Sequence, residues 1–268
     1  MSETEFAALH RRAEPLLLPN AWDHASAALL ADAGFRAVAT TSLGVAAAAG
    51  RPDGARTTRD ETLRVAKILG ADRRYLLSID AEDGYSDDPA EVAAYARELA
   101  AAGAVGLNLE DGRPDGTLTD PALHAAKIAA VKTAVPELFV NARTDTHWLD
   151  RRREETLPRL TAYRDAGADG VFVPGISDPA EISELVKAIA LPLNVLYRPG
   201  GLSITELGDI GVRRISLGSL LYRVALGAAL HVAGEIAEGR PAGPAELHAP
   251  SYADVQQLSA PPDSGSDV

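Results

Sequence analysis

Acidic side chains follow two apolar segments of the chain, at the point where each segment ends. The segment 76–80 reads Leu-Leu-Ser-Ile-Asp, and the segment 105–109 runs directly into Glu110. If both segments are parallel strands of one sheet, Asp80 and Glu110 lie at the same edge of it. Neighbouring carboxylates repel one another unless a cation or a proton lies between them, and Mg²⁺ prefers oxygen ligands. The spacing therefore predicts a divalent-cation site at this edge, with Mg²⁺ as the ion and Mn²⁺ as the alternative.

Other acids in the same region have an ordinary structural interpretation. Asp83, Asp87 and Asp88 precede a predicted helix, and acidic residues favour the cap and the first turn of a helix. We interpret these three as solvated loop acids or helix caps. Asp80 and Glu110 differ from them, because each directly follows a segment whose composition is typical of a buried strand.

A wider set of residues follows the predicted strands, where a parallel barrel carries its functional sites. The set is Asn20, Trp22, Thr41, Ser42, Leu43, Gly44, Asp80, Glu82, Glu110, Asp111, Asn141, Arg143, Asp145, Pro174, Gly175, Asn194, Arg198 and the segment Ser216–Gly218. Arg143 offers a planar fork that matches a carboxylate, so it either binds a substrate carboxylate or neutralises Glu110. Asn194 is either a substrate-binding amide or a turn residue at a strand end.

No other catalytic motif accompanies these residues. His24 and His124 fall in predicted helices, no histidine pair has the spacing of zinc ligands, and the arginine run 151–153 is typical of a solvated helix start. The chain has neither a G-x-S-x-G nucleophile motif nor a P-loop. It contains no cysteine, which excludes disulfides, thiolate zinc sites and a cysteine acid.

The charge of the chain limits its partners. A net charge of −12 over 268 residues argues against a nucleic-acid surface and against anionic lipid. The N-terminus is charged and no uninterrupted apolar run reaches membrane-spanning length, so we expect a cytoplasmic protein that binds neither nucleic acid nor membrane. An anionic substrate then needs a cation or arginines close to it.

A recurring pattern of helix, glycine and apolar strand organises the chain. It occurs at Ala33-Gly34-Phe35, Ala102-Gly103-Ala104, Ala166-Gly167-Ala168 and Ile210-Gly211-Val212. Glycine ends a helix by adopting a left-handed conformation, and the strand follows at once. The strands are predicted at residues 16–18, 36–41, 75–80, 105–110, 138–143, 170–174, 192–196 and 213–217.

Eight strands that alternate with helices predict an α/β fold, a (β/α)8 TIM-type barrel. A doubly wound open sheet is the rival, but no strand is followed by a G-x-G-x-x-G loop. We expect one barrel domain over residues 1–240, ending in a long apolar helix from Ser219. Residues 241–268 are expected to be a partly disordered C-terminal extension, because they are rich in Pro, Ser and Asp.

Five motifs in this order resemble the isocitrate lyase/phosphoenolpyruvate mutase superfamily, from about Leu16 to Gly218. They are Thr41-Ser42-Leu43-Gly44, Gly50-Arg51-Pro52-Asp53, Asp80-Ala81-Glu82-Asp83-Gly84-Tyr85, Leu109-Glu110-Asp111 and Asn141-Ala142-Arg143-Thr144-Asp145. The resemblance implies Mg²⁺-dependent cleavage or formation of a C–C bond next to a 2-oxo or 2-hydroxy acid, through an enolate-type oxyanion. It also implies a homo-tetramer in which the last barrel helix is exchanged between subunits.

The resemblance also implies roles for individual residues. Asp80 is the direct metal ligand, and Asp53, Glu82 and Glu110 act mostly through bound water. The residues expected to take part in catalysis are Arg143, Glu110 and Asp53. Together with the strand-end set, the resemblance gives the substrate-binding residues Thr41, Ser42, Leu43, Gly44, Arg143 and Asn194.

The segment 111–120 departs from the lyases of that superfamily. The lyases that cleave isocitrate or 2-methylisocitrate carry a Lys-x-Cys-Gly-His-type loop after the fourth strand, and its cysteine serves as the acid. Here the segment reads Asp-Gly-Arg-Pro-Asp-Gly-Thr-Leu-Thr-Asp. Arg113, Asp115 and Thr119 stay open as alternative proton donors, and the loop is a candidate gating lid.

We therefore expect a lyase that acts on a small di- or tricarboxylic acid. One alternative is a hydrolase of an oxaloacetate-type C–C bond, or an enzyme of phosphonate P–C bonds. Another is a barrel that binds 2-oxo acids such as pyruvate, oxaloacetate or 2-oxoglutarate with little catalysis.

Overall fold

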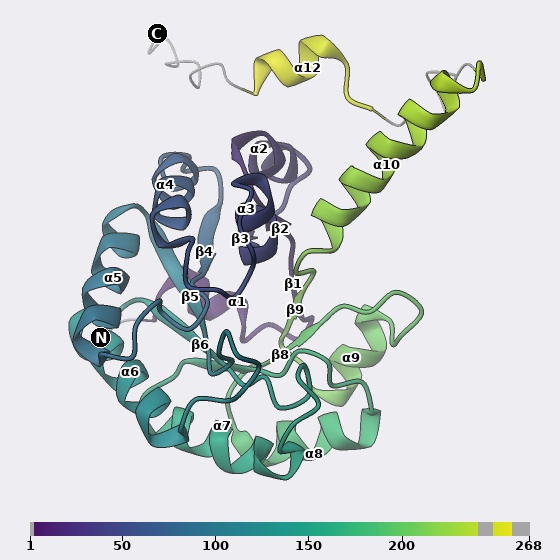
Figure 1. Ribbon diagram of the computed structural model, residues 1–268. Helices are drawn as coiled ribbons and strands as arrows, with labels where there is room; N and C mark the ends of the chain where they lie inside the picture. Colours follow the sequence, from purple (N-terminus) through teal and green to yellow (C-terminus); the bar gives the residue numbers. More distant parts are fainter. Residues whose placement is uncertain (1–2, 241–248, 259–268) are drawn as a thin grey trace, which may run out of the picture.

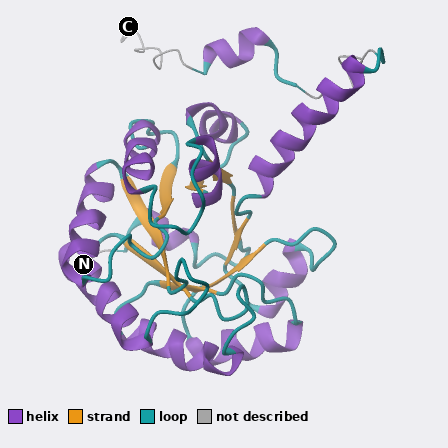
Figure 2. Ribbon diagram, viewed as in Figure 1, coloured by secondary structure: helices purple, strands orange, loops and turns teal. Residues whose placement is uncertain are grey.

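A barrel of parallel strands inside a ring of helices forms the body of the computed structural model, which describes residues 3–240 and 249–258 (Figures 1 and 2). The strands are β1 (Leu16–Leu18), β2 (Asn20–Ala21), β3 (Ala37–Thr40), β4 (Leu76–Asp80), β5 (Ala104–Glu110), β6 (Phe139–Arg143), β7 (Gly170–Phe172), β8 (Leu193–Leu196) and β9 (Arg214–Ser216). They are paired in the order β1-β9-β8-β7-β6-β5-β4-β3-β2, all parallel. The predicted (β/α)8 TIM-type fold is confirmed.

The described part has nine strands where eight were expected, because Pro19 divides the first one. Proline has no N–H to donate to a ladder. Leu16–Leu18 pair with β9, while Asn20–Ala21 pair with β3, so the two pieces close the barrel together. Ala39 N donates to Pro19 O at 2.8 Å, which keeps the broken strand in the sheet.

The helices are α1 (Glu5–Leu9), α2 (His24–Asp32), α3 (Ser42–Ala48), α4 (Arg59–Leu69), α5 (Pro89–Ala101), α6 (Pro121–Ala134), the short 3-10 helix η1 (Arg153–Glu155), α7 (Thr156–Asp165), α8 (Pro179–Ile189), α9 (Ile204–Ile210), α10 (Leu220–Ala237) and α12 (Tyr252–Gln257). Three of them begin with a proline after an aspartate cap, at Asp88, Asp120 and Asp178. Proline suits the first turn because its missing N–H has no partner there anyway. Helix α3 is not predicted from the sequence, in which the small residues of this segment are typical of a loop.

Helix α1 closes the amino-terminal end of the barrel. Its Phe6 and Leu9 pack with Leu18, Ala37, Ala39 and Phe139 in a small apolar cluster that is separate from the main core. The rings of Phe6 and Phe139 meet edge to face at 5.4 Å. We call this cluster of α1 and the strands the plug. Gly106 on β5 is close to the plug, since a Cβ there would lie 2.7 Å from Phe6 Cε1. Helix α1 does not cover the opposite, carboxyl-terminal ends of the strands, where a parallel barrel carries its functional site.

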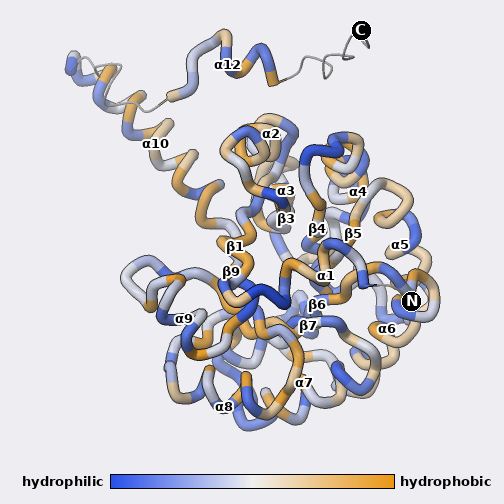
Figure 3. The backbone as a smooth tube through the Cα atoms, turned by 180° about the vertical axis from the view of Figure 1, so that it is seen from behind, coloured by the Kyte–Doolittle hydropathy of each residue, from blue (hydrophilic) through white to orange (hydrophobic). Residues whose placement is uncertain are grey.

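Helix α10 extends away from the barrel instead of packing on it (Figure 1), and apolar residues recur along its length (Figure 3). Its apolar side chains Val224, Leu226, Leu230 and Ile236 are exposed. By length and composition alone it is also the one helix of the described residues that is long and apolar enough to cross a membrane. Only its first turn packs closely, where Tyr222 meets Trp22 at 5.2 Å between ring centroids.

Part of the predicted C-terminal extension has a definite structure. Residues 252–257 form α12, and Leu258 is buried with its carbonyl 2.8 Å from His24 Nε2. The remainder of the extension, 241–248 and 259–268, lies outside the described residues, so its disorder stays a prediction.

The glycines of the repeated helix–strand pattern take the left-handed conformation that the sequence predicts. Gly34, Gly103, Gly167 and Gly211 have φ values of 92°, 107°, 101° and 107°. Gly103 has a second constraint, because a Cβ there would lie 2.6 Å from the backbone oxygen of Gly70, whereas one at Gly34 would meet nothing within 4 Å.

This contrast gives a matched pair of substitutions. We expect Gly34→Ala to lower the free energy of unfolding by about 1 kcal/mol, the cost of a left-handed alanine. Gly103→Ala should cost roughly 2–4 kcal/mol, because overpacking against the backbone adds to that strain. Urea unfolding followed by circular dichroism measures both, and equal losses would contradict the role of the Gly70 contact.

Candidate active site at the carboxyl ends of the strands

The structure brings Glu110, Arg143 and Asp145 together at the carboxyl ends of β5 and β6. Glu110 and Arg143 are register partners, and their side chains meet with Arg143 Nη1 2.6 Å from Glu110 Oε2. Arg143 also makes a bidentate contact to Asp145, through Nε at 2.6 Å and Nη2 at 3.1 Å. Both ion pairs are largely shielded from solvent. The guanidinium therefore forms an ion pair with Glu110, and it is fixed by two carboxylates at once. Its role in binding a substrate carboxylate stays a prediction.

Asp80 stands at the end of the neighbouring strand β4, next to the start of α3. Its Oδ2 accepts a hydrogen bond from Ser42 N at 3.1 Å, and its own N donates to Thr40 Oγ1 at 2.8 Å. Its Oδ1 is buried and has no hydrogen-bond partner. The predicted segment Thr41–Gly44 thus lies beside the predicted metal ligand, but the Ser42 amide is engaged by Asp80.

Gly44 is required at its position by the packing of this segment. A Cβ on Gly44 would lie 2.8 Å from Thr41 Cγ2 and 3.0 Å from Trp22 Cβ. The close approach places Trp22 against the segment, and Tyr222 of α10 in turn packs on Trp22. The first turn of α10 is thereby connected to the rim of the site.

Glu82 is buried in the loop after β4 and is held by the loop before α4. Its Oε1 accepts from Thr58 Oγ1 at 2.6 Å, and its Oε2 accepts from Arg56 N at 3.4 Å. Its φ of 49° is left-handed, an unfavourable conformation for a residue with a side chain. Burial raises the pKa of Glu82 to about 7, and the bond from Thr58 opposes that shift.

Two further predicted acids are held in a way that disfavours their charge. Burial raises the pKa of Glu110 well above its usual value, although Arg143 acts in the opposite direction. Burial of the carboxyl group and the charge of Asp80 raise the pKa of Asp53, whose residue lies on the exposed loop before α4. A cation among these carboxylates would stabilise their ionised forms.

The predicted metal residues do not converge into a closed coordination cage. Among residues 3–240 and 249–258, no group of three or more acidic or histidine side chains lies close enough together to hold an ion directly. The unpartnered Oδ1 of Asp80 fits a single direct ligand. The outer role of Asp53, Glu82 and Glu110 stays a prediction. This donor set of oxygens fits Mg²⁺, which keeps several waters and few protein ligands.

Asp111 holds the segment that follows Arg143 in place through hydrogen bonds, a role that is not predicted from the sequence. It is fully buried, and its carboxylate accepts four hydrogen bonds. The donors are Thr144 Oγ1 at 2.8 Å, Asp145 N at 2.8 Å, Arg159 Nη1 at 3.1 Å and Tyr163 OH at 2.7 Å. Because Asp145 orients Arg143, Asp111 fixes the position of the Arg143 guanidinium indirectly. No local motif indicates Arg159 or Tyr163, which lie some fifty residues further along the chain.

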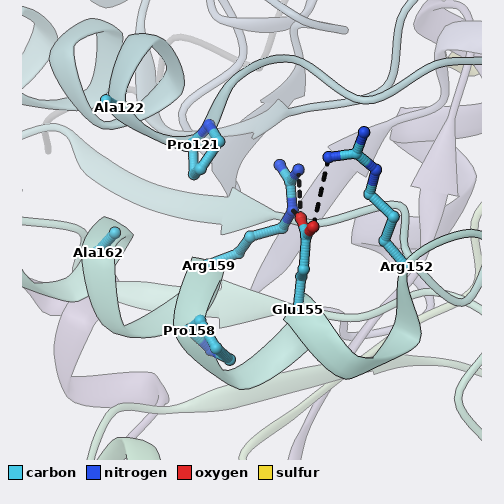
Figure 4. Close-up of a pocket in the computed structure, with 7 residues that line it drawn as sticks. All are labelled: Pro121, Ala122, Arg152, Glu155, Pro158, Arg159 and Ala162. Atoms are coloured by element: carbon cyan, nitrogen blue, oxygen red, sulfur yellow. Dashed lines mark hydrogen bonds and ion pairs between the residues drawn. The ribbon is translucent and has the colours of Figure 1, made fainter.

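Arg159 connects this centre to the groove between α6 and α7. It donates to Glu155 Oε2 through Nε at 3.0 Å and Nη2 at 2.8 Å, and Arg152 contacts the same carboxylate from the other side (Figure 4). These residues line a cavity of about 440 Å³, and Pro121, Ala122, Pro158 and Ala162 complete its walls. None of the strand-end residues lines this cavity, so it is separate from the candidate active site.

The loop after β5 is a short hairpin whose polar side chains bind one another. Arg113 donates to Asp87 Oδ1 at 3.0 Å and to Thr119 Oγ1 at 3.2 Å. Asp115 accepts from Thr117 N at 2.9 Å and from Thr117 Oγ1 at 2.6 Å. Each of the three proposed proton donors is therefore engaged within the loop or with the neighbouring loop.

The surroundings of four residues can be compared with the simple interpretation of the sequence. Asp83 is not a solvated loop acid: it is buried and paired with Arg56 (Nε–Oδ2 2.8 Å), with Lys127 nearby. Asp87 is half exposed and shared by Arg56 and Arg113, while Asp88 caps α5 as expected. Asn194 is fully buried inside the barrel and donates to Ser216 Oγ at 3.0 Å. Its role in substrate binding stays a prediction.

Comparison with known proteins identifies the family of the chain. Residues 6–237 match the model of the phosphoenolpyruvate phosphomutase family. An uncharacterised protein of Mycobacterium tuberculosis (strain ATCC 25618 / H37Rv) is 47% identical over 236 residues, 87% of this chain and 89% of the relative. An oxaloacetate decarboxylase of Ectopseudomonas mendocina (strain ymp) is 31% identical over 212 residues, 75% of this chain and 71% of that enzyme.

Solved structures agree with this relationship. A protein of Burkholderia cenocepacia J2315 described as a candidate lyase/mutase is 39% identical, with a TM-score of 0.85 over 96% of this chain and 95% of that one. A phosphonopyruvate hydrolase solved with oxalate and Mg²⁺ shares the fold, with a TM-score of 0.82 and 22% identity over 94% of this chain and 93% of that one. The predicted resemblance is confirmed, and so is the prediction of an enzyme of this type. The chain belongs to the phosphoenolpyruvate phosphomutase family, within the isocitrate lyase/phosphoenolpyruvate mutase superfamily.

Proposed function

We propose that the protein is a Mg²⁺-dependent lyase, with Mn²⁺ as the alternative ion, that cleaves the C–C bond next to a 2-oxo or 2-hydroxy carboxylate. The observation that carries the proposal is the guanidinium of Arg143, fixed by Glu110 and Asp145 at the strand-end rim that also holds the unpartnered Oδ1 of Asp80. Cleavage beside a carbonyl leaves negative charge on an enolate oxygen. A fixed positive group at that place stabilises charge that develops in the transition state.

The residues divide into a cation side and an anion side. Asp80 would hold the divalent ion directly, with Asp53, Glu82 and Glu110 around it. When bound, the ion supplies Lewis-acid stabilisation of the developing oxyanion. Arg143 would bind a substrate carboxylate with the face that its two acid partners leave open, and Leu43 and Gly44 would line the same end of the site.

The contacts of the hairpin after β5 favour one version of this chemistry. Arg113 donates to Asp87 and Thr119, and the Thr119 hydroxyl that accepts this bond is fully buried. Asp115 accepts from Thr117, which lowers the pKa of its carboxyl. None of the three is therefore poised to protonate a leaving group. Decarboxylation of a 2-oxo dicarboxylate needs no such acid: the C–C bond breaks, its electron pair passes into the enolate, and CO₂ leaves. Water can protonate the enolate afterwards. Oxaloacetate is therefore the first substrate to test, in line with the related decarboxylase.

NMR of the purified protein with Mg²⁺ and a panel of acids tests the proposal. The panel holds oxaloacetate, 2-methylisocitrate, isocitrate, 2-methylmalate, phosphonopyruvate and phosphoenolpyruvate. We expect Mg²⁺-dependent release of a 2-oxo acid from one of them, with pyruvate from oxaloacetate as the first candidate. Binding of 2-oxo acids without turnover of any member would instead support a binding barrel.

Asp80→Asn is the matching variant. We expect it to fold and to lose at least roughly 10²–10³-fold in turnover, because the direct cation ligand is gone. Free Mg²⁺ also promotes decarboxylation of oxaloacetate, so wild type and variant must be compared at the same Mg²⁺ concentration. Equal rates in the two proteins would remove Asp80 from the mechanism.

The raised pKa of Glu82 gives a prediction for the metal-free protein. A carboxyl with a folded-state pKa of about 7 binds more protons in the folded than in the unfolded state between about pH 4.5 and pH 7. Its contribution to stability is thus complete below that window and is lost as pH rises through it. We expect a loss on the order of 2 kcal/mol between pH 5 and pH 8 from this group.

Urea unfolding in EDTA at several pH values measures this loss. Glu82→Gln cannot ionise, so its free energy of unfolding should fall less over the same range. Identical pH profiles for variant and wild type would show that Glu82 ionises normally. Added Mg²⁺ should reduce the pH dependence of the wild type, because a bound cation favours the ionised carboxyl.

We propose further that α10 is covered by another copy of the chain in a homo-oligomer, with the tetramer implied by the family resemblance as the expected state. An exposed apolar helix face of this length is typical of an interface. Light scattering after gel filtration should give a multimer for wild type and a smaller species for the double variant Leu226→Glu, Leu230→Glu. A monomeric wild type would contradict the proposal.

A further inference from the structure

Arg214 is a fully buried arginine inside the barrel, at the first position of β9. Its Nε donates to Ser216 Oγ at 3.2 Å and its Nη2 to Asn108 Oδ1 at 3.1 Å, while Nη1 is buried without a partner. The ion pairs of the described residues include none that joins it to an acid within 4 Å. A guanidinium inside a protein normally has a carboxylate partner, so this one requires an explanation.

Its surroundings are polar but uncharged on every side except toward the active site. Below it lies the plug, where the ring of His10 stacks on Phe139 with 4.3 Å between centroids. Beside it, Asn108 also accepts from Asn141 Nδ2 at 2.8 Å, and Asn194 is its register partner on β8. Toward the active site, Asn108, which accepts from Arg214, is the register partner of Asp80 on β4. The charge of Asp80 raises the pKa of Arg214, while burial lowers that pKa to about 9.

Four buried polar atoms without hydrogen-bond partners lie in the barrel interior around Arg214. Arg214 Nη1, Asn194 Oδ1, Ser78 Oγ and Asp80 Oδ1 are all buried without hydrogen-bond partners. They come from strands β9, β8 and β4, and they combine donors with acceptors. Buried polar atoms of this kind act together with ordered water or with a ligand.

The fold alone gives no reason for the charge. Burying a guanidinium without a counter-ion opposes folding, and an apolar side chain of similar volume is often as good or better for stability. The acid linked to Arg214 through Asn108 is Asp80, in the strand-end site. The position of Arg214 is therefore best explained by an effect on that site.

We propose that Arg214 is a positioning residue of the active site, whose positive charge beneath Asp80 offsets the clustered carboxylates and so favours an anionic ligand in the cation-loaded site. The inference rests on the proposed function, because it concerns the cation and anion that the site would hold. Arg214 does not touch the ligand: Asn108 and Ser216 hold the guanidinium in the interior, and it acts through Asp80.

The charge predicts opposite effects on the two ligands. Even at an effective dielectric constant of about 20, removing a unit positive charge from the barrel interior changes the affinity of a doubly charged ligand by roughly tenfold or more. In Arg214→Met, Mn²⁺ alone should therefore bind at least about tenfold more tightly, and oxalate should bind the Mn²⁺-loaded protein at least about tenfold more weakly. Electron paramagnetic resonance of Mn²⁺ and titration calorimetry of oxalate measure the two affinities on the full chain.

Two variants serve as controls. Arg214→Lys keeps the charge and should retain both affinities within a few-fold, even if it loses stability. Arg213→Met removes the charge of the adjacent, half-buried arginine and should change neither affinity. If Arg214→Met fails to fold, Arg214→Gln, which can still donate a hydrogen bond but has no charge, has the same expected pattern.

The pattern separates an electrostatic role from a structural one. Loosened packing would lower the affinities for both Mn²⁺ and oxalate and would lower the free energy of unfolding. Arg214→Lys would then not restore the two affinities. That result would overturn the proposal. So would unchanged affinities in Arg214→Met. Tighter Mn²⁺ with weaker oxalate, in a variant as stable as wild type, supports it.

A double-mutant cycle keeps the inference separate from the proposed function. In EDTA, unfolding of wild type, Arg214→Met, Asp80→Asn and the double variant measures the coupling of the two charges without any ligand. Arg214→Met changes the equilibrium constant of unfolding by a certain factor. We expect that factor to be about tenfold different when the substitution is made in the wild-type protein and when it is made in the Asp80→Asn variant. Additive changes would overturn the inference, whereas a wild type that binds neither Mn²⁺ nor oxalate but shows the coupling would overturn only the proposed function.

Discussion

The two-sided ion pair of Arg143 is the interaction on which the rest of the site depends. Glu110 and Asp145 meet the same guanidinium, and without it two buried carboxylates would face each other at the rim of the barrel. The geometry of that fork is set at longer range. Asp111 holds the backbone of Asp145, and Arg159 and Tyr163 of α7 hold Asp111. The outer helix α7 thereby determines where the positive charge of Arg143 lies at the rim of the barrel.

The loops around this centre are held in unfavourable conformations by contacts between them. Arg56, Glu82 and Tyr85 all have positive φ values although none is glycine. Arg56 binds Asp83 and Asp87, and Lys127 donates to the backbone oxygen of Asp83 at 3.0 Å. These ion pairs offset local strain of roughly 1–3 kcal/mol for each such residue. Thr58 and Arg56 hold the carboxyl of Glu82 in the buried position, and that burial raises its pKa to about 7.

The sequence predicts the parts of this structure that depend on local order, and it misses those that depend on distant partners. Alternation of strands with glycine-terminated helices is enough for the barrel, and residues after strands are enough to bring Asp80, Glu110 and Arg143 to one rim. Pro19 predicts the end of a strand, yet it only interrupts one, because β9 and β3 bind the chain on either side of it. Asp83 has the sequence context of a loop acid because nothing near it along the chain reveals Arg56 and Lys127. Arg214 is missed because it begins a strand instead of following one.

The balance of charge explains how so acidic a protein can hold an anion. Asp53, Asp80, Glu82, Glu110 and Asp145 surround the site, against Arg143 within it and Arg214 beneath it. Burial makes each ionised carboxyl costly, so the proposed divalent ion would bind with a favourable electrostatic contribution and would compensate much of the negative charge. The guanidinium groups would then act on a ligand without a competing cluster of free negative charge. The proposed function therefore implies that a substrate carboxylate would bind the cation-loaded site more tightly than the cation-free site.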